Sequence, residues 1–276
     1  MIFKDIIDEG IDVDPGRRTI SFNPDHERII NTSVHDNPTR DDGFRIKFDP
    51  SVTHIKNAEV WSVFKRVNSN DVIDSNHLIY ALKGERGWKF RTDKDRNAII
   101  NCIGNIVEKF AKTHTYHTVV IIPSTKPVNE IVASIVVRKL KGSISIKSLF
   151  AKLNVQEVYN KILEDGSTFR KRFKGHLFYD KLDIFNNCMR ALVGNRDPES
   201  VPFVLHRITD PDVRNAIDST LRISDPKLYH GDIDGKDVLL IDDIISRGTS
   251  IKDSINTMMT CYKPNSITVL SLISRR

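Results

Sequence analysis

Short apolar runs alternate with amphipathic segments along the C-terminal two thirds of the chain. Across residues 93–112, apolar side chains recur at intervals of three and four, which predicts a helix capped by Thr92 and Asp95. The run 118–122 is short and rich in β-branched residues, as in a buried parallel strand. Residues 129–140 then return to helical spacing. A strand, a loop and a helix in this order begin a βαβ unit.

The same alternation closes the sequence, with a strand predicted over 238–241, a helix over 250–261 and a strand over 267–273. Between these clear regions the pattern is weaker. There it predicts a strand over 143–150, helices over 154–164 and 181–193, and a short helix that begins at Asp210-Pro211. Elements that alternate in this way favour an α/β fold with a doubly wound parallel sheet.

The first 92 residues follow a different pattern, with frequent turn signals and short candidate strands over 18–22, 44–48 and 59–67. We therefore expect two parts. Residues 1–92 are predicted to form a β-rich accessory region, a candidate hood over a binding site. Residues 93–276 are predicted to form the α/β domain, with a basic insertion at about 138–200.

The composition is that of an ordinary globular protein, with 276 residues of which 39% are hydrophobic and 28% charged. Three widely spaced cysteines form neither a disulfide framework nor a zinc-binding CxxC pair. No apolar run approaches the roughly 20 residues that span a bilayer. These features predict a cytoplasmic protein without a membrane partner.

The formal net charge is +6, and its excess is concentrated in one segment. Residues 138–181 hold 11 Lys and Arg against 4 Asp and Glu, with Arg170, Lys171, Arg172 and Lys174 at the centre. This distribution predicts a basic arm that either closes over a polyanionic substrate or docks a nucleic acid or a partner protein.

The segment 238–250 carries the strongest chemical signal. Asp242 and Asp243 follow the apolar strand, at the carboxyl end where open α/β sheets bind ligands. The loop 246–250 combines a glycine with hydroxyl side chains at the start of a helix, which favours an anion. Carboxylates repel a bare phosphate, so the acid pair is suited to hydroxyl groups, with or without Mg²⁺. A phosphorylated sugar fits both halves.

These residues resemble the binding signature for phosphoribosyl pyrophosphate (PRPP) in type I phosphoribosyltransferases, and Arg247 before the Gly-Thr pair is similar to amidophosphoribosyltransferases. The resemblance implies a doubly wound sheet of the type I phosphoribosyltransferase kind. It also implies that Asp242 and Asp243 are the catalytic residues, which hold the ribose hydroxyls and meet Mg²⁺ only indirectly, through them. The other residues implied to bind PRPP are Ser246, Arg247, Gly248, Thr249 and Ser250 at the 5′-phosphate, and Ser124, Thr125 and Lys126 at the pyrophosphate.

The reaction implied by this resemblance is transfer of 5-phosphoribose from PRPP to a nitrogen acceptor, a nucleobase or an amine, with release of pyrophosphate. The protein would then be a Mg²⁺-dependent pentosyltransferase of nucleotide metabolism, and we expect a homo-oligomer. The chain departs from two branches of the family. Ser246 stands where the 6-oxopurine salvage enzymes carry an acid, and no cysteine nucleophile follows Met1.

Two alternatives stay open on the same fold. One is a non-catalytic protein that senses PRPP or a nucleotide and contacts nucleic acid or a partner protein. Arg207, Arg214 and Arg222, upstream of Gly235-Lys236, are loosely similar to arginines of competence-associated phosphoribosyltransferase-like proteins, which are linked to DNA uptake. The other alternative is a toxin or defence effector that acts on a nucleotide pool.

Overall fold

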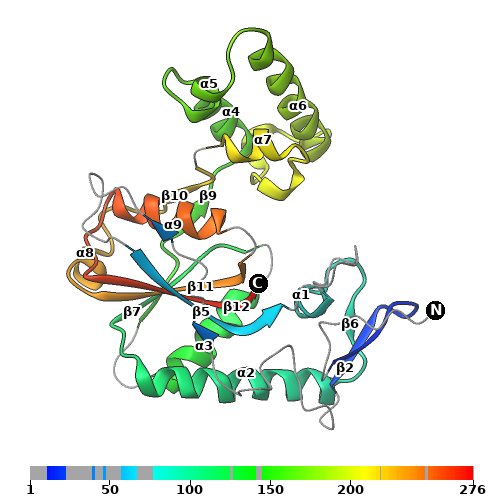
Figure 1. The fold of residues 1–276 in the computed structure, drawn as a ribbon, viewed down its shortest axis with the longest axis vertical. Helices are drawn as coiled ribbons and strands as arrows, with labels where there is room; N and C mark the ends of the chain where they lie inside the picture. Colours follow the sequence, from blue (N-terminus) through cyan, green and yellow to red (C-terminus); the bar gives the residue numbers. More distant parts are fainter. Residues whose placement is uncertain are drawn as a thin grey trace. The chain divides into compact units, whose positions relative to one another are not determined.

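The protein divides into two compact units, which are drawn in Figure 1. The computed structural model describes residues 11–22, 39–40, 46–47, 57–66, 77–124, 127–140, 145–217, 219–245 and 248–275. We call the first unit the sheet unit, and it comprises Met1–Leu149, Lys227–Lys252 and Tyr262–Arg276. The second, the helical unit, comprises Phe150–Pro226 and Asp253–Cys261.

A parallel sheet forms the centre of the sheet unit. Its five strands are, in spatial order, β5 (Asn57–Arg66), β12 (Ser266–Arg275), β11 (Asp237–Ile245), β7 (Thr118–Ile121) and β8 (Ser145–Lys147). The short strands β3 (Thr39–Arg40) and β4 (Ile46–Lys47) pair antiparallel with β5. The protein is therefore α/β, with a five-stranded parallel sheet flanked by helices, which is compatible with a doubly wound fold. The strands predicted at 118–122, 238–241 and 267–273 are confirmed.

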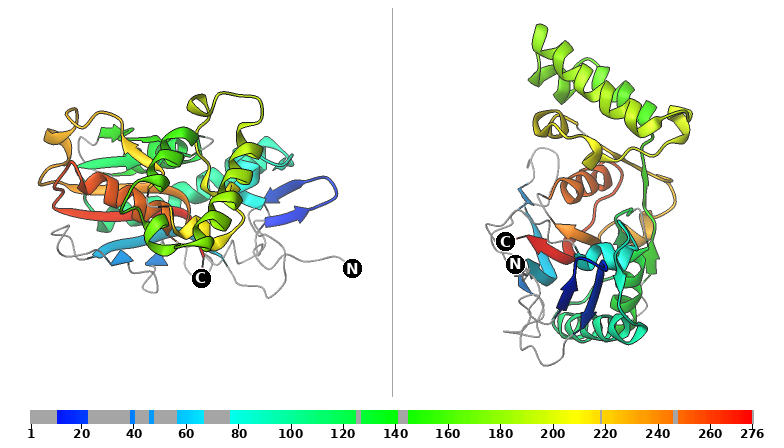
Figure 2. Two further views of the ribbon diagram at one scale, coloured as in Figure 1. Left: turned by 90° about the horizontal axis from the view of Figure 1, so that it is seen from above. Right: turned by 90° about the vertical axis from the view of Figure 1, so that its right-hand side faces the viewer.

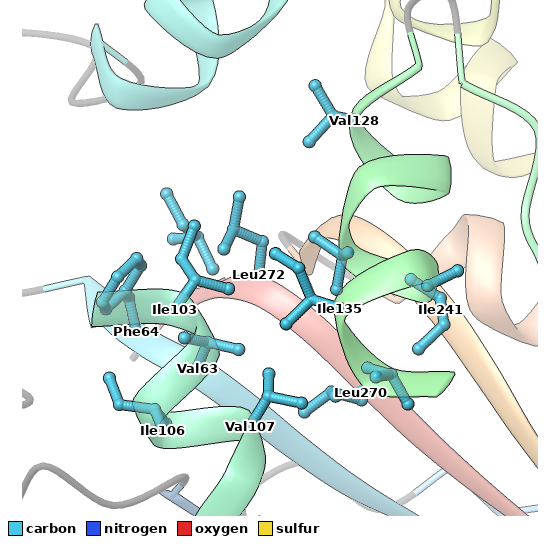
Figure 3. Packing of buried hydrophobic residues seen from close by; sticks show 14 of the residues in the cluster. Val63, Phe64, Ile103, Ile106, Val107, Val128, Ile135, Ile241, Leu270 and Leu272 are labelled. Atoms are coloured by element: carbon cyan, nitrogen blue, oxygen red, sulfur yellow. The ribbon is translucent and has the colours of Figure 1, made fainter. Parts of the chain in front are cut away.

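Both faces of this sheet are buried, as expected for parallel strands with continuous apolar runs. On one face, Ile121, Ile241 and Leu270 share a hydrophobic cluster with the helices α2 (Asp93–Thr113) and α3 (Val128–Lys139), part of which is drawn in Figure 3. On the other face, Val120, Leu240 and Val269 are fully buried. The two helices predicted over 93–112 and 129–140 are thus confirmed as α2 and α3.

The start of α2 is determined by the predicted cap. Oγ1 of Thr92 accepts a hydrogen bond from the N–H of Asp95 over 3.2 Å, and Oδ2 of Asp95 accepts from the N–H of Thr92 over 3.0 Å. The second carboxylate oxygen of Asp95 accepts from the N–H of Phe22 over 2.8 Å. Phe22 ends β2 (Thr19–Phe22), so the cap also joins the N-terminal region to α2.

The connections leave a topological switch point between β7 and β11. β7 continues through α3 to β8 on one side, whereas β11 continues through α9 (Thr249–Met259) to β12 on the other side. β11 also extends beyond the end of β7. Its pairing with β7 ends at Ile241, whereas its pairing with β12 continues to Ile245. Open α/β sheets bind ligands in the crevice at such a point, outside the carboxyl ends of the strands.

The N-terminal region contributes to the sheet unit in two ways. β1 (Ile11–Asp14), β2 and β6 (Lys89–Phe90) form a separate small sheet, whose hairpin is visible in Figure 2. β5, by contrast, is a parallel strand of the main sheet beside β12. The boundary predicted after residue 92 therefore does not coincide with the division into units. The alternation within 59–67 is imperfect because both faces of β5 contact other residues: Val60, Val63 and Phe64 are all buried.

The helical unit has a hydrophobic core of its own, built around Phe169, Phe185 and Phe203, each almost fully buried. Figure 2 shows its helices in green and yellow. Its elements are α4 (Val155–Leu163), α5 (Thr168–Arg172), α6 (His176–Val193), α7 (Pro211–Asn215), the single-turn 3-10 helices η1 (Pro198–Ser200) and η2 (Leu205–Arg207), and the antiparallel pair β9 (Phe150–Lys152) and β10 (Leu221–Ile223).

Predictions for this middle region are confirmed in part. α4 begins at the predicted cap, where Asn154 and Glu157 form a second capping box. The prediction of one continuous strand over 143–150 was wrong, because β8 and β9 are separate strands that belong to different sheets. α6 begins five residues earlier than predicted. The short helix that begins at Asp210-Pro211 was predicted from apolar residues at intervals of four, Val213, Ile217 and Leu221, but α7 ends at Asn215 because Leu221 belongs to β10.

In the described part of the chain, no helix combines the length and the apolar character needed to cross a membrane. The three cysteines, Cys102, Cys188 and Cys261, are half-buried and form no disulfide.

Candidate functional site

The two acids of the motif lie at the carboxyl end of β11, beside the switch point. Asp242 and Asp243 are only 6% and 7% exposed. Asp242 pairs in register with Ser271 of β12, whereas β7 has already ended on the other side. The N–H of Asp243 donates to Oδ1 of Asp242 over 2.9 Å. The acid pair is therefore held by the sheet on one side and meets the loop after β7 on the other.

Ser124 of that loop contacts the acid pair directly. Its hydroxyl donates to Oδ2 of Asp243 over 2.8 Å. The approach follows from the sheet, because the N–H of Ile122 donates to the carbonyl of Ile241 over 3.0 Å and extends the pairing of β7 with β11 by one step. The structure thus brings together Ser124, predicted to bind the pyrophosphate, and Asp243, predicted to bind the ribose hydroxyls of the same ligand.

A buried lysine completes the group. Nζ of Lys83 forms an ion pair with Oδ2 of Asp243, and the Lys83 side chain is only 12% exposed. Lys83 is the last residue of α1 (His77–Lys83), a helix of the N-terminal region that the sequence analysis did not predict. Asp243 therefore receives a cation and a hydroxyl on the same oxygen, from two elements far apart in the sequence.

Asp242 has a different environment from its neighbour. Burial raises the pKa of Asp242 to about 8, and the negative charge of Asp243 adds to this shift. The Asp243 N–H, the Lys83 ammonium and a hydrogen bond from the Asn129 side chain oppose it. Asn129, fully buried in the first turn of α3, also donates to the carbonyl of Ile122 over 2.7 Å. The two acids therefore divide the roles, since Asp243 is paired with a cation while Asp242 favours its protonated form.

The glycine loop leads from β11 into α9. Gly248 has a φ of 70°, in the left-handed region that favours glycine, and Thr249 is the first residue of α9. The N–H of Lys252 donates to the carbonyl of Gly248 over 2.8 Å, so the helix begins directly at this turn. Ser250 lies in the first turn of α9. The predicted site residues Ser246, Arg247, Thr125 and Lys126 lie outside the described residues.

Comparison with known proteins found no matching family model, no similar curated protein and no similar solved structure. What the site can do therefore follows from its residues and their geometry. It presents one ion-paired carboxylate, one carboxyl group with a raised pKa and a serine hydroxyl, beside a glycine turn that starts a helix. Such a set can hold neighbouring hydroxyl groups and an anion at the same time.

Two residues of this site were missed by the sequence analysis, Lys83 and Asn129. Each carried a weak signal. Asn129 is a polar residue in a predicted buried helix, and Lys83 ends the apolar stretch 78–82 just before Gly84. Neither signal specifies a partner, because the contacts of both residues depend on tertiary structure.

Proposed function

We propose that this protein is a phosphoribosyltransferase of the type I kind, which transfers 5-phosphoribose from PRPP to a nitrogen acceptor and releases pyrophosphate. The observation that carries the proposal is the contact of Ser124 with Asp243 across the switch point. The family resemblance requires the loop after the first strand and the acid pair to serve one ligand, and here they lie within one hydrogen bond of each other. The glycine turn at Gly248 and the start of α9 follow the same strand.

The chain's own residues would act by binding and orienting the sugar phosphate. In the described part of the chain both side-chain contacts of Asp243 go to Oδ2 and none goes to Oδ1, which can accept a hydrogen bond from a ribose hydroxyl. Asp242 can donate or accept beside it. The N–H groups at the start of α9 and the positive end of its dipole would hold the 5′-phosphate.

In the implied reaction, the bond between C1 of the ribose and pyrophosphate breaks and its electron pair leaves with the pyrophosphate. The lone pair of the acceptor nitrogen forms the new bond to C1, and the nitrogen then loses its proton to solvent. Groups that stabilise the charge of the departing pyrophosphate lower the barrier most. The loop that begins at Ser124 is the segment that the resemblance assigns to this task.

The residues at the site fit Mg²⁺ only in an indirect role. The described residues include no group of three or more His, Cys, Asp or Glu side chains arranged to hold a metal ion. Mg²⁺ is commonly bound through one or two carboxylates together with substrate phosphates. A magnesium ion that arrives on PRPP, near Asp242 and Asp243, would neutralise charge on the leaving pyrophosphate.

The test of the proposed function is release of pyrophosphate from PRPP. We expect the protein, with Mg²⁺ and a panel of nucleobases and amines, to release pyrophosphate with at least one acceptor. Asp243→Asn should lower kcat/KM about 10- to 100-fold, because it replaces a charged hydrogen-bond acceptor of the ribose. A coupled assay for pyrophosphate measures kcat/KM for the wild type and for the variant.

The matched control is Asp183→Asn, an exposed acid on α6, which should keep the wild-type rate. Binding of PRPP without release for any acceptor would contradict the enzyme proposal and favour a sensing protein on the same fold. Equal rates for Asp243→Asn and the control would show that the acid pair is not the PRPP site.

A second candidate function, contact with a nucleic acid, is favoured by the surface of the helical unit. Leu177 and Tyr179 on α6 are 47% and 66% exposed, and the exposed lysines Lys171 and Lys174 precede them in the chain. Exposed aromatic side chains beside cations are typical of surfaces on which single-stranded nucleic acids stack.

Several cations of the predicted basic arm form contacts within the helical unit. The guanidinium of Arg172 forms an ion pair with Asp212 over 2.7 Å, and the ammonium of Lys181 forms one with Asp210 over 2.8 Å. Arg170 donates to the carbonyl of Leu163 over 2.6 Å. These cations therefore stabilise the helical unit, which leaves Lys171 and Lys174 as the better candidates for an external anion.

Replacing Lys171 and Lys174 together with glutamate should weaken binding of a single-stranded oligonucleotide at least about tenfold and reduce the slope of log K against log salt concentration by about 1.4. PRPP binding should not change. Fluorescence anisotropy at several salt concentrations measures the first effect. Replacing the exposed Arg190 and Arg207 of the same unit with glutamate is the matched control. Equal loss in both variants, or no oligonucleotide binding by the wild type, would remove this candidate.

A further inference from the structure

Lys83 reaches the acid pair from a helix that is itself rigidly held. Leu78, Ile79, Tyr80 and Ala81 of α1 are all buried, so the helix has little freedom to rotate. The helix ends at Gly84, whose φ of 62° lies in the left-handed region.

The segment after α1 is also held in place. The N–H of Glu85 donates to the carbonyl of Tyr80 over 2.8 Å, and the guanidinium of Arg86 lies 4.4 Å from the centre of the Tyr80 ring. The Trp88 ring contacts His77, with 4.1 Å between ring centres. The position of Lys83 is therefore set by the fold rather than by a flexible surface chain.

The charges at the site need a buried cation. The Asp243 carboxylate is more than nine-tenths buried, and its negative charge both opposes ionisation of the adjacent Asp242 and repels an anionic ligand. Among the described residues, Lys83 is the only cation with an ion pair to either acid. A buried ion pair that loses one partner leaves an uncompensated charge, which is costly. The electrostatics of the acid pair therefore depend on Lys83.

We propose that Lys83 is a positioning residue of this site, which fixes the Asp243 carboxylate for ribose hydroxyls and offsets the negative charge that would otherwise repel a sugar phosphate. The inference rests on the proposed function. It assigns part of the PRPP site to the N-terminal region, because Lys83 lies at the end of α1. It also predicts that the contribution of Lys83 to binding affinity increases with the negative charge of the ligand.

The experiment compares wild type with Lys83→Met, Lys83→Gln and Lys83→Arg, and uses PRPP with Mg²⁺ and ribose 5-phosphate as probes in calorimetric titrations. We expect Lys83→Met and Lys83→Gln to weaken PRPP binding by about 30-fold or more. They should weaken binding of ribose 5-phosphate, which carries fewer charges, much less. Lys83→Arg keeps the cation and should recover most of the PRPP affinity.

Lys112→Met is the matched control, because Lys112 forms an ion pair with Glu108 but lies exposed on α2. Lys83→Gln retains a hydrogen-bond donor of similar length, so it serves if the methionine variant does not fold. A purely structural role of Lys83 would weaken both ligands equally, and that result overturns the proposal. Tighter PRPP binding by the neutral variants also overturns it, because it would show that the ammonium competes with the ligand.

The outcomes separate this inference from the proposed function. If the wild type binds PRPP and the neutral variants match Lys112→Met, the role of Lys83 is refuted while the proposed function stands. If the wild type does not bind PRPP, the proposed function fails, and the inference that rests on it fails too.

Discussion

Replacing Asp242 with asparagine should stabilise the protein at pH 8. Burial raises the pKa of Asp242 from its ordinary value to about 8, so the folded protein holds a proton there that the unfolded chain releases near pH 4. Asparagine resembles the protonated acid in shape and keeps an oxygen that can accept from the N–H of Asp243. The variant therefore avoids burial of a negative charge on residue 242 beside the charged Asp243.

The pH dependence follows from proton linkage. Because the folded pKa is raised, the stabilising contribution of Asp242 is complete below the unfolded pKa and is lost as the pH rises through the folded pKa. Between about pH 4 and pH 8, the free energy of unfolding should thus fall more steeply in wild type than in Asp242→Asn. At pH 8 we expect the variant to be more stable by about 2 kcal/mol or more.

Denaturant unfolding of both proteins at a series of pH values measures this difference and cancels the titration of groups that the two share. Asp243→Asn is the informative comparison, because it removes the partner of the buried Lys83 ammonium and should destabilise the fold. Parallel pH profiles for wild type and Asp242→Asn would contradict a raised pKa.

Replacing Asp253 with alanine should cost the helical unit about 3 kcal/mol of its free energy of unfolding. Asp253 on α9 is 7% exposed, and burial raises its pKa. Its carboxylate accepts from the Ser219 hydroxyl, the Thr220 N–H and the Thr220 hydroxyl, each over 2.7 Å. Alanine leaves the two Thr220 donors without their acceptor at a half-buried position, whereas the Ser219 hydroxyl can still donate to the carbonyl of Leu221 over 2.9 Å. Loss of an acceptor from donors that are shielded from water is the costly case for a hydrogen bond.

Thermal or denaturant unfolding of Asp253→Ala measures this loss. The exposed Asp183→Ala on α6 is the control and should stay within about 0.5 kcal/mol of wild type. Asp253→Asn should fall between the two, because its amide oxygen accepts one hydrogen bond while its NH₂ group faces donors. A loss in Asp253→Ala as small as that in the control would contradict the role of the carboxylate.

The elements that the sequence predicted well are those with strong local signals. α2 and α4 begin at capping boxes that can be recognised from residue types three positions apart, such as Thr92 and Asp95. The apolar runs of β7 and β11 are short and can only be buried, and Asp242 and Asp243 follow the apolar run near the carboxyl end of β11. The contact of Ser124 with Asp243 follows once the two strands are neighbours, and parallel order makes their carboxyl ends meet.

The elements that could not be predicted depend on partners far away in the sequence. β5 has the composition of a half-buried strand, and nothing local shows that it pairs with β12 in the main sheet. Lys83 and Asn129 are polar residues whose role appears only when α1 and α3 meet the end of β11. α7 ends at Asn215 although apolar residues continue at helical intervals to Leu221, because Leu221 pairs with β9 as part of β10.

The pairing of β5 with β12 also has a consequence for biosynthesis. Register partners such as Glu59 and Thr268 are about 200 residues apart, so at typical translation rates β5 leaves the ribosome about 10–40 s before its neighbour. During that interval one edge of β5 stays open, and its apolar residues Val60, Val63 and Phe64 lack their final cover. Nascent chains that stall before β12 should therefore aggregate or recruit chaperones, whereas the helical unit, built from contacts closer in sequence, can begin to fold while translation continues.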